Sequence, residues 1–386
     1  MQPRSPCHLP FDSRWRERNP RIFPPSLFYN AEVKTWDIII IGGGIIGLSL
    51  ALALRRRGAS ILVVERGEPG REASHAAGGM LVDCGLETPA ALQSLATASA
   101  RMYPQFAKDL EFESGVHVDL RDNGTIMFPS SDHVHEQSTL PIKNLSPASL
   151  AELEPALAEI NRPAIYLQER SVDPRALSSA AWKAAKHRGV DFSSGDEVTA
   201  VTIVDGRASG VKTIKTAFHA TKIVNCAGAW SGQIAPHTFP TRPVKGQMLC
   251  LLLPSRTSLK HVIRSPEVYL IPRSDGRLLV GATVEEAGFD KRTDIATIQR
   301  LHRAALDLIP RLRDAKILED WAGLRPGTPD ALPILGSTAT PGYYVATGHF
   351  RDGILLAPIT AKVMAAVIDG RAPECDLSQF SPTRFQ

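Results

Sequence analysis

A glycine-rich segment near the start of the chain has the residue types and spacing of a nucleotide-binding site. Gly42, Gly44 and Gly47 follow the G-x-G-x-x-G pattern directly after the apolar run Ile38–Ile41. The first glycine permits a tight turn, the second lets backbone approach a pyrophosphate, and the third lets helix and strand pack closely. The pattern therefore predicts a dinucleotide site at this turn.

An acidic residue completes the pattern. Glu65 ends a second apolar strand, Ile61–Val64, where a carboxylate can accept hydrogen bonds from ribose hydroxyls. The helix between the two strands is expected to end near Gly58, and its N-terminus offers free N–H groups and partial positive charge to a pyrophosphate. Strand, glycine turn, helix, strand and acid thus occur in the order that a dinucleotide-binding unit requires.

Two alternatives compete with this interpretation. The segment from Trp36 to Arg57 is apolar and close to the ~20 residues of a membrane span, but glycines interrupt it and charged residues frame it. A glycine-rich turn without a ligand is the other alternative, and it leaves Glu65 unexplained.

Composition indicates an ordinary globular protein. The 386 residues suffice for two domains, and 43% apolar and 22% charged residues are typical values. Of the formal charge of +4, residues before Thr35 carry +3. The remainder offers no basic face, so we expect neither nucleic acid nor a membrane surface as a partner.

Cysteine usage points to a reducing compartment. The five cysteines are an odd number and include no C-x-x-C pair. This pattern favours free thiols over a disulfide framework or a metal site, and hence a cytoplasmic location.

The first 35 residues are rich in Pro and Arg and lack the apolar stretch of a signal peptide. We expect a disordered extension over residues 1–35. An organelle transit segment and a tail from an upstream start codon are both open, the second favoured by the prolines.

The rest of the chain alternates helical and strand patterns. The small-residue segment 70–81 is expected to be a loop that crosses close to a flat ligand. Helices are expected over 89–112, 146–158, 174–189 and 294–309, and after 353 to Ile368. Strands are expected around 198–204, 210–214, 222–226, 268–272, 277–283 and 343–346.

Strand-to-glycine junctions occur at residues 42, 228 and 348, far apart in the sequence. If they share one ligand, the fold is α/β with a discontinuous Rossmann-like domain and an inserted α+β substrate domain containing an antiparallel sheet. We assign 36–110, 165–238 and 318–386 to the first domain, and 111–164 and 239–317 to the second. A substrate pocket is then expected at the domain boundary.

Eight sequence blocks together resemble the glycine oxidase branch of the D-amino acid oxidase family of flavoproteins. The resemblance spans Trp36 to about Ile368. The blocks are IGGGIIG at 41–47, EASHAAGGML at 72–81, NCAGAWSG at 225–232, PVKGQML at 243–249, VYLIPR at 268–273, GRLLVGATVE at 276–285, WAGLRPGTPDALPILG at 321–336 and GHFRDGILLAP at 348–358.

The resemblance implies that the dinucleotide is non-covalent FAD rather than NAD. A second helix N-terminus, at Gly348–Leu355, could then face the flavin and stabilise negative charge; an ordinary strand–helix turn is the alternative. Besides the three glycines, the FAD contacts implied are Ile45, Ile46, Glu65, Arg66, Ala73, Ser74, Gly78, Gly79, Met80, Val198, His349, Phe350, Arg351, Asp352, Gly353, Ile354 and Leu355.

Three residues are implied in substrate binding. Arg325 would hold an α-carboxylate bidentately, because a guanidinium presents a fork of donors and stays charged. Tyr269 would donate its hydroxyl to the same carboxylate, and Arg351 would line the pocket near the flavin. The alternatives are a surface arginine, a core tyrosine and a solvated arginine at a helix start.

The chain departs from the better-known pattern at two positions. Glu267 stands where some glycine oxidases carry a histidine, and Val284 stands where a methionine can occur. Both positions line or border the expected pocket, so the side-chain preference stays open.

The resemblance implies an enzyme that oxidises glycine and other small amino acids or amines by hydride transfer to FAD, with dioxygen as the acceptor and no side-chain acid or base. The imine product would give glyoxylate and ammonia, or feed thiazole synthesis for thiamine, with thiazole synthase as a partner. We also expect a homo-oligomer. The alternatives are an oxidase or dehydrogenase of D-amino acids or sarcosine, a flavin-binding protein without turnover, and an NAD-dependent dehydrogenase.

Overall fold

The predicted strand–helix–strand unit opens the first sheet of the computed structural model, which describes residues 34–83, 88–129, 142–254 and 259–385. Strand β1 (Thr35–Ile41), helix α1 (Ile45–Arg55) and β2 (Ile61–Glu65) follow in order, and the two strands pair in parallel. Ile38 and Ile40 of β1 pack into one hydrophobic cluster, whereas Ile39 and Ile41 pack into another on the opposite face. The strand is therefore buried on both faces, as its continuous apolar run predicts.

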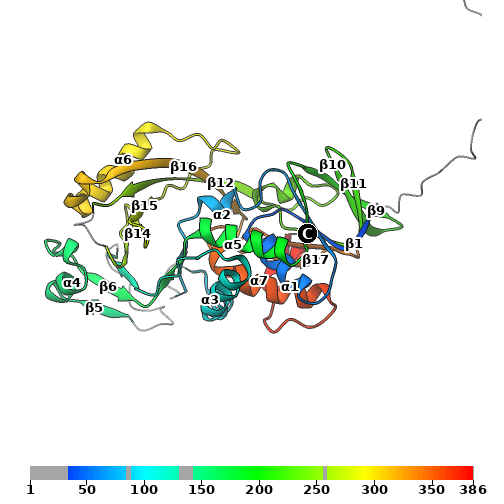
Figure 1. Cartoon of the computed structure of the whole chain (residues 1–386), viewed down its shortest axis with the longest axis horizontal. Coiled ribbons are helices and arrows are strands. Elements are labelled where there is room, and N and C mark those ends of the chain that lie inside the picture. Colours follow the sequence, from blue (N-terminus) through cyan, green and yellow to red (C-terminus); the bar gives the residue numbers. More distant parts are fainter. Residues whose placement is uncertain (1–33, 84–87, 130–141, 255–258, 386) are drawn as a thin grey trace, which may run out of the picture. The chain divides into compact units, whose positions relative to one another are not determined.

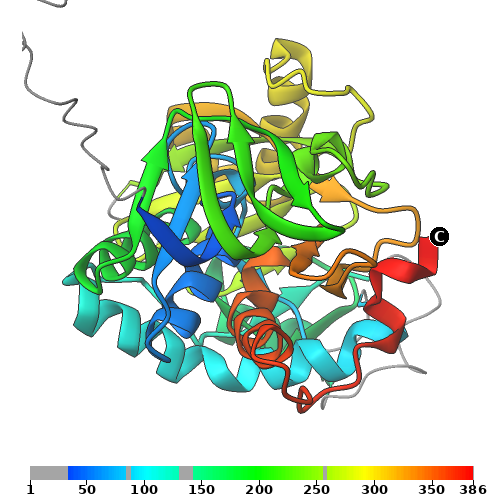
Figure 2. The ribbon, with the colours of Figure 1, turned by 90° about the vertical axis from the view of Figure 1, so that its right-hand side faces the viewer.

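The first sheet has eight strands. Its main path runs β17 (Ile334–Ser337), β18 (Tyr343–Thr347), β11 (Ala217–Asn225), β1, β2 and β8 (Asp191–Ser194). Strands β9 (Val198–Val204) and β10 (Arg207–Thr213) extend β11 as an antiparallel meander. Figure 2 shows the meander strands, in green, facing the viewer above the helices.

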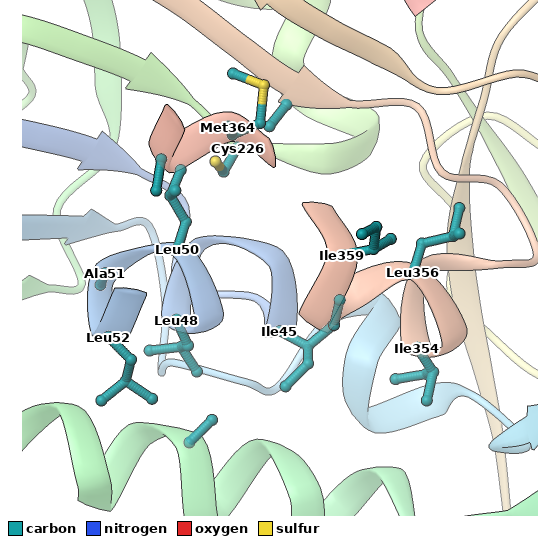
Figure 3. Close-up of a cluster of buried hydrophobic side chains, with 14 of the residues drawn as sticks. Ile45, Leu48, Leu50, Ala51, Leu52, Cys226, Ile354, Leu356, Ile359 and Met364 are labelled. Carbon is teal, nitrogen blue, oxygen red and sulfur yellow. The ribbon is translucent and has the colours of Figure 1, made fainter. Parts of the chain in front are cut away.

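Four helices cover the face of this sheet to which Ile38 and Ile40 point. They are α1, α3 (Gln93–Ser114), α5 (Pro174–His187) and α7 (Gly353–Ile368). Their contact is apolar; Figure 3 shows Ile45 of α1 near Ile359 of α7. Helix α5 starts at Pro174, as its proline predicts. The structure adds an N-cap, because the Asp173 carboxylate accepts hydrogen bonds from the N–H groups of Arg175 and Ala176.

The second sheet also has eight strands. Its order is β16 (Lys316–Gly327), β12 (Arg242–Leu252), β15 (Arg277–Gly281), β14 (Tyr269–Pro272), β13 (Val262–Arg264), β4 (Thr125–Met127), β6 (Ala164–Leu167) and β5 (Lys143–Leu145). Neighbouring strands pair antiparallel except β4 and β13. Helices α6 (Ile295–Leu308) and α4 (Pro147–Leu153) belong to this half, and α6 covers one face (Figure 1).

The uncovered face of the second sheet is set by strand register. Cross-strand pairing places Met127, Arg264, Tyr269, Gly281 and Met248 in one row. Residues that pair directly across strands share a face. Alternate residues such as Leu270 pack instead with α6. The row therefore faces away from α6, toward the cofactor loop described next.

The segment 70–81 differs from the predicted loop. It contains a one-turn helix, α2 (Ala73–Ala76), and a short strand, β3 (Met80–Leu81), which pairs with β7 (Arg170–Ser171). A helix of four residues is too short to produce a helical period of apolar residues, so the sequence pattern did not reveal it. We call residues Ala73–Met80 the cofactor loop.

Strand pairing crosses two of the proposed domain boundaries. Strands β6 and β16 pair in the second sheet, although most of their residues fall in segments assigned to the first domain. Residues Trp36–Gln386 form one compact unit, so the division into two domains stays a prediction. In the part of the chain that the structure describes, no helix is long and apolar enough to cross a membrane.

Candidate cofactor and substrate site

A cavity of about 880 Å³ lies between the first sheet and the open face of the second. It is lined by the carboxyl ends of four adjacent strands, β18, β11, β1 and β2, so the three strand-to-glycine junctions meet at one site. All of the predicted cofactor and substrate residues line it except Gly47 and Leu355, which lie behind the wall. Ligands bind at this edge in open α/β sheets.

The three motif glycines have different roles. Gly42 has φ +102°, and a Cβ there would lie 2.5 Å from the carbonyl oxygen of Cys226. A Cβ on Gly47 would overlap the carbonyl oxygen of Gly42, so Gly47 permits the close packing of α1 on its own turn. At Gly44 the nearest atom to such a Cβ is the Ser74 Oγ at 3.4 Å. The Gly44 backbone is therefore accessible from the cavity.

Glu65 has a structural role that the motif does not reveal. Its two carboxylate oxygens accept hydrogen bonds from the N–H groups of Gly43 (2.7 Å) and Gly67 (2.8 Å). Burial raises the pKa of Glu65, and these two N–H groups oppose the shift. A carboxylate has about four lone-pair positions, so Glu65 can hold the glycine turn and still accept ribose hydroxyls.

The N-terminus of α1 faces the cavity beside the cofactor loop. The Ser74 Oγ accepts a hydrogen bond from the Ile45 N–H at 2.9 Å. Gly44, the N-cap residue, provides no side chain for this role. A loop 29 residues away thus supplies the cap, and it places a hydroxyl where the helix dipole favours an anion.

Residues after β11, in the block NCAGAWSG at 225–232, also line the cavity. No residue of this block is among the predicted cofactor contacts. The guanidinium of Arg66 lies 4.3 Å from the centre of the Trp230 ring, a cation–π distance. Ala227, Gly228 and Ala229 line the wall beside it. The signal for them was the apolar strand that runs into small residues at 227–229, in a block that the family resemblance included.

Helix α7 begins at Gly353, inside the segment Gly348–Leu355 in which its N-terminus is predicted. Residues before it form a turn in which the Phe350 N–H donates to the Pro326 carbonyl at 3.0 Å. His349 is buried, its Nε2 lies 3.1 Å from the Thr360 Oγ1, and burial lowers its pKa to about 3. This histidine is therefore neutral at physiological pH.

The three predicted substrate residues meet at one end of the cavity, which we call the substrate end. Tyr269 and Arg325 act on one another electrostatically, and the charge of Arg351 acts on both. The Tyr269 hydroxyl donates to the Met248 Sδ at 3.7 Å. Burial raises the pKa of Tyr269 and lowers that of Arg325, while each partner opposes the shift of the other. The Arg325 Nη1 also donates to the Thr283 carbonyl at 3.1 Å. A half-buried guanidinium and a phenol hydroxyl thus face the cavity together.

Glycines in three other segments make room for these two side chains. A Cβ on Gly281 would lie 2.8 Å from the Tyr269 ring, and one on Gly246 would lie 2.5 Å from the Arg325 Nη2. Gly78 of the cofactor loop lies against the same ring, with a Cβ position 3.5 Å from the hydroxyl. Glycine inside a strand often marks such close approach, which is the signal that could have predicted Gly246 and Gly281.

The two departures from the family pattern differ in placement. Val284 is about half exposed (54%) and lines the cavity. Glu267 is exposed, accepts a hydrogen bond from the Ser265 hydroxyl at 2.9 Å, and does not line the cavity, although Ser265 and Pro266 do. Val284 therefore contributes to the wall, and Glu267 borders it.

Described cysteines and acidic groups provide no metal site. No group of three or more His, Cys, Asp or Glu side chains in the described ranges is arranged to hold a metal ion. Cys226 lines the cavity, but burial raises the pKa of its thiol. A protonated thiol is a poor nucleophile, which agrees with non-covalent flavin.

The cavity fits FAD on the chemistry of its walls. Glu65 can accept ribose hydroxyls, and Gly44 and the α1 N-terminus present N–H groups and open backbone to a pyrophosphate. In the cofactor loop, Gly78 and Gly79 line the cavity while packing closely against Ile271 and Pro174, where a Cβ would clash. We call the part around Gly42–Gly47 and Glu65 the cofactor end.

Comparisons with known proteins agree with the geometry. A family described as DAO, FAD dependent oxidoreductase, matches residues 37–367. A bifunctional protein ThiO/ThiG from Trichormus variabilis is 36% identical over 91% of this chain, which spans only 55% of that protein. A glycine oxidase from Pseudomonas putida is 31% identical, over 90% of this chain and 98% of the relative.

A solved structure is similar over the whole unit. The crystal structure of glycine oxidase from Geobacillus kaustophilus matches with a TM-score of 0.85 and 29% identity, covering 91% of this chain and 99% of that one. The family match covers most of the chain, and the cavity has the chemistry of a flavin dinucleotide site. The chain belongs to the DAO family of FAD-dependent oxidoreductases, and its cofactor is FAD.

Proposed function

We propose that this protein catalyses the FAD-dependent oxidative deamination of glycine and other small amino acids or amines. The observation that carries the proposal is the meeting of Tyr269, Arg325 and Arg351 at one end of a cavity whose other end fits FAD. A guanidinium paired with a phenol hydroxyl is suited to an α-carboxylate.

In this mechanism Arg325 binds the substrate carboxylate through two parallel N–H donors, and Tyr269 donates its hydroxyl to the same group. Together they fix the α-carbon, so proximity and orientation carry much of the catalysis. FAD held at the cofactor end would supply the hydride acceptor, with dioxygen as the final oxidant. Burial at the substrate end favours the neutral amine, which can lose hydride without a side-chain base. We therefore assign no acid or base.

The balanced reaction converts glycine, water and dioxygen to glyoxylate, ammonia and hydrogen peroxide. Hydride loss from the neutral amine, with loss of a proton, leaves an imine, which water hydrolyses. We further propose that the imine feeds thiazole synthesis for thiamine, with thiazole synthase as partner, in the cytoplasm and as a homo-oligomer. The name ThiO/ThiG of a relative supports this partner, although the chain spans only 55% of that protein.

A second candidate is oxidation of sarcosine or of small D-amino acids. The observation that favours it is the apolar lining near the substrate end, where Val82, Met127 and Val284 reach the cavity. Such a wall tolerates a methyl group on nitrogen or on the α-carbon.

A peroxide assay of the purified flavoprotein across glycine, sarcosine, D-alanine and D-proline tests both candidates. We expect turnover with glycine and at least one other amine. Reduction of the flavin by none of these amines under anaerobic conditions would contradict the proposal. Acid precipitation should release the flavin to the supernatant, and size-exclusion chromatography with light scattering measures the oligomeric state.

A further inference from the structure

Three side chains of one strand segment converge on Gly78 of the cofactor loop. Tyr269, Ile271 and Arg273 are alternate residues of β14 and its C-terminal extension, so they point to the same face. A Cβ on Gly78 would lie 2.8 Å from Ile271 Cδ1 and 3.4 Å from Tyr269 Cε2. The Arg273 Nη2 donates to the Gly78 carbonyl at 2.5 Å. The strand thus holds this glycine by packing and by one charge-assisted hydrogen bond.

Arg273 is a buried cation whose hydrogen-bond partner is a backbone carbonyl, that of Gly78. It is 3% exposed, and its Nε and Nη1 have no hydrogen-bond partner among the described residues. Asp173 and Asp119 act on it through space, but Asp173 accepts a hydrogen bond from Arg277 and caps α5, and Asp119 accepts one from the Ser274 N–H. Burial lowers the pKa of Arg273 to about 10, so the group is charged at neutral pH.

The Gly78 carbonyl fixes the direction of the next N–H. The bond between Gly78 and Gly79 is trans, and in a planar trans peptide the C=O and the following N–H point in opposite directions. Because the carbonyl points at Arg273, the Gly79 N–H points away from Arg273, and Gly79 itself lines the cavity. Among the described groups no acceptor takes a hydrogen bond from this N–H, whereas the Gly79 carbonyl accepts from Val172.

We propose that Arg273 is a positioning residue that orients the Gly78–Gly79 peptide, so that the Gly79 N–H donates to bound FAD beside the Tyr269 hydroxyl. A guanidinium on the carbonyl also polarises the peptide and strengthens its N–H as a donor. This role goes beyond the proposed reaction, because it holds for whichever amine is oxidised.

The test compares Arg273→Met with Arg277→Met. The two arginines belong to the same hairpin and lose the same charge, but Arg277 binds Asp173 and Asp275 rather than the cofactor loop. FAD binding to apoprotein is measured by quenching of flavin fluorescence, and the midpoint potential of bound flavin by reductive titration. We expect Arg273→Met to weaken FAD binding about tenfold and to make the potential more negative. Arg277→Met should change the FAD dissociation constant less than twofold, even if it lowers the melting temperature as much as Arg273→Met does.

Equal effects of the two variants on FAD binding and potential would overturn the proposal, as would no effect of Arg273→Met on either. Arg273→Lys keeps the charge but not the fork and should weaken FAD binding about threefold. If Arg273→Met does not fold, an Arg273→Lys protein with the wild-type dissociation constant overturns the role and a threefold loss supports it. None of these measurements uses an amine, so a failure of the proposed reaction would be recognised separately.

Discussion

The cofactor end and the substrate end of the cavity are built in different ways. At the cofactor end, most of the residues come from the stretch Trp36–Arg66, with Ser74 and Trp230 added from elsewhere in the chain. The contacts are largely with backbone, such as Glu65 with the Gly43 N–H. At the substrate end, Tyr269 and Arg325 come from separate strands, and Gly78, Gly246 and Gly281 from three other segments make room for them.

The difference shows which contacts each ligand needs. A dinucleotide presents a pyrophosphate that backbone N–H groups and a helix end can bind. A small amino acid offers one carboxylate and a few carbon atoms, so it has to be oriented by particular side chains. Changes at the cofactor end should therefore remove FAD, whereas changes at the substrate end should leave FAD bound and affect turnover.

The largest effect is expected from Gly47→Val. The new side chain would overlap the Gly42 carbonyl oxygen and crowd Ile40 of β1. Overpacking of this kind should lower the free energy of unfolding by about 3 kcal/mol or more. We expect little folded protein and no bound flavin, measured by circular dichroism and by the visible spectrum. A folded yellow variant would show that the turn is not required at the cofactor end.

Arg325→Ala should give the largest effect that leaves the fold intact. Removing one partner of a desolvated charge pair costs about 2–5 kcal/mol, or roughly 30-fold to several thousand-fold in kcat/KM for glycine. Flavin content should not change. Arg325→Lys should restore only part of the activity, because an ammonium cannot reproduce the bidentate contact.

An amine without a carboxylate is the control for this variant. It should lose almost nothing on the change to alanine. If the amine and glycine lose activity equally, Arg325 has a structural role and the substrate assignment is wrong.

The cofactor end was largely predictable because its signals are local. Hydrophobic period, glycine spacing and a terminal acid occur within Trp36–Arg66, and the structure has strand, helix and strand in that order. What the motif could not reveal is that Glu65 also binds Gly43 and Gly67, since both the carboxylate and the N–H groups have other plausible partners. The one-turn helix α2 was missed because four residues carry no period.

The substrate end was predicted by family resemblance rather than from physical patterns. Tyr269 and Arg325 are 56 positions apart in the numbering, and only the register of β14, β15, β12 and β16 brings them together. Strand register depends on tertiary pairing, which a single sequence shows poorly. The glycines at 246 and 281 were visible inside apolar strands, but the residue that each accommodates lies on a different strand.

Gly246→Ala tests this indirect contribution. A methyl group there would displace the Arg325 guanidinium, since its Cβ would lie 2.5 Å from Nη2. A misplacement of about 1 Å can cost about 100-fold in rate, so we expect a loss of 10- to 100-fold in kcat/KM for glycine. FAD affinity should stay within twofold of wild type, measured by fluorescence quenching. A loss of flavin instead would mean that the two ends are not separable.

The smallest effect is expected from residues that line or border the substrate end without binding the carboxylate. Val284→Met adds bulk to the cavity wall, and the ratio of kcat/KM for sarcosine to that for glycine should change about three- to tenfold. Glu267→His should change the same ratio less than twofold, because the Glu267 side chain is exposed and turned to Ser265. Steady-state peroxide assays with both amines measure the two ratios. If Glu267→His changes the ratio more than Val284→Met, the side-chain preference is determined beyond the cavity wall, and the substrate end extends further than Tyr269 and Arg325 indicate.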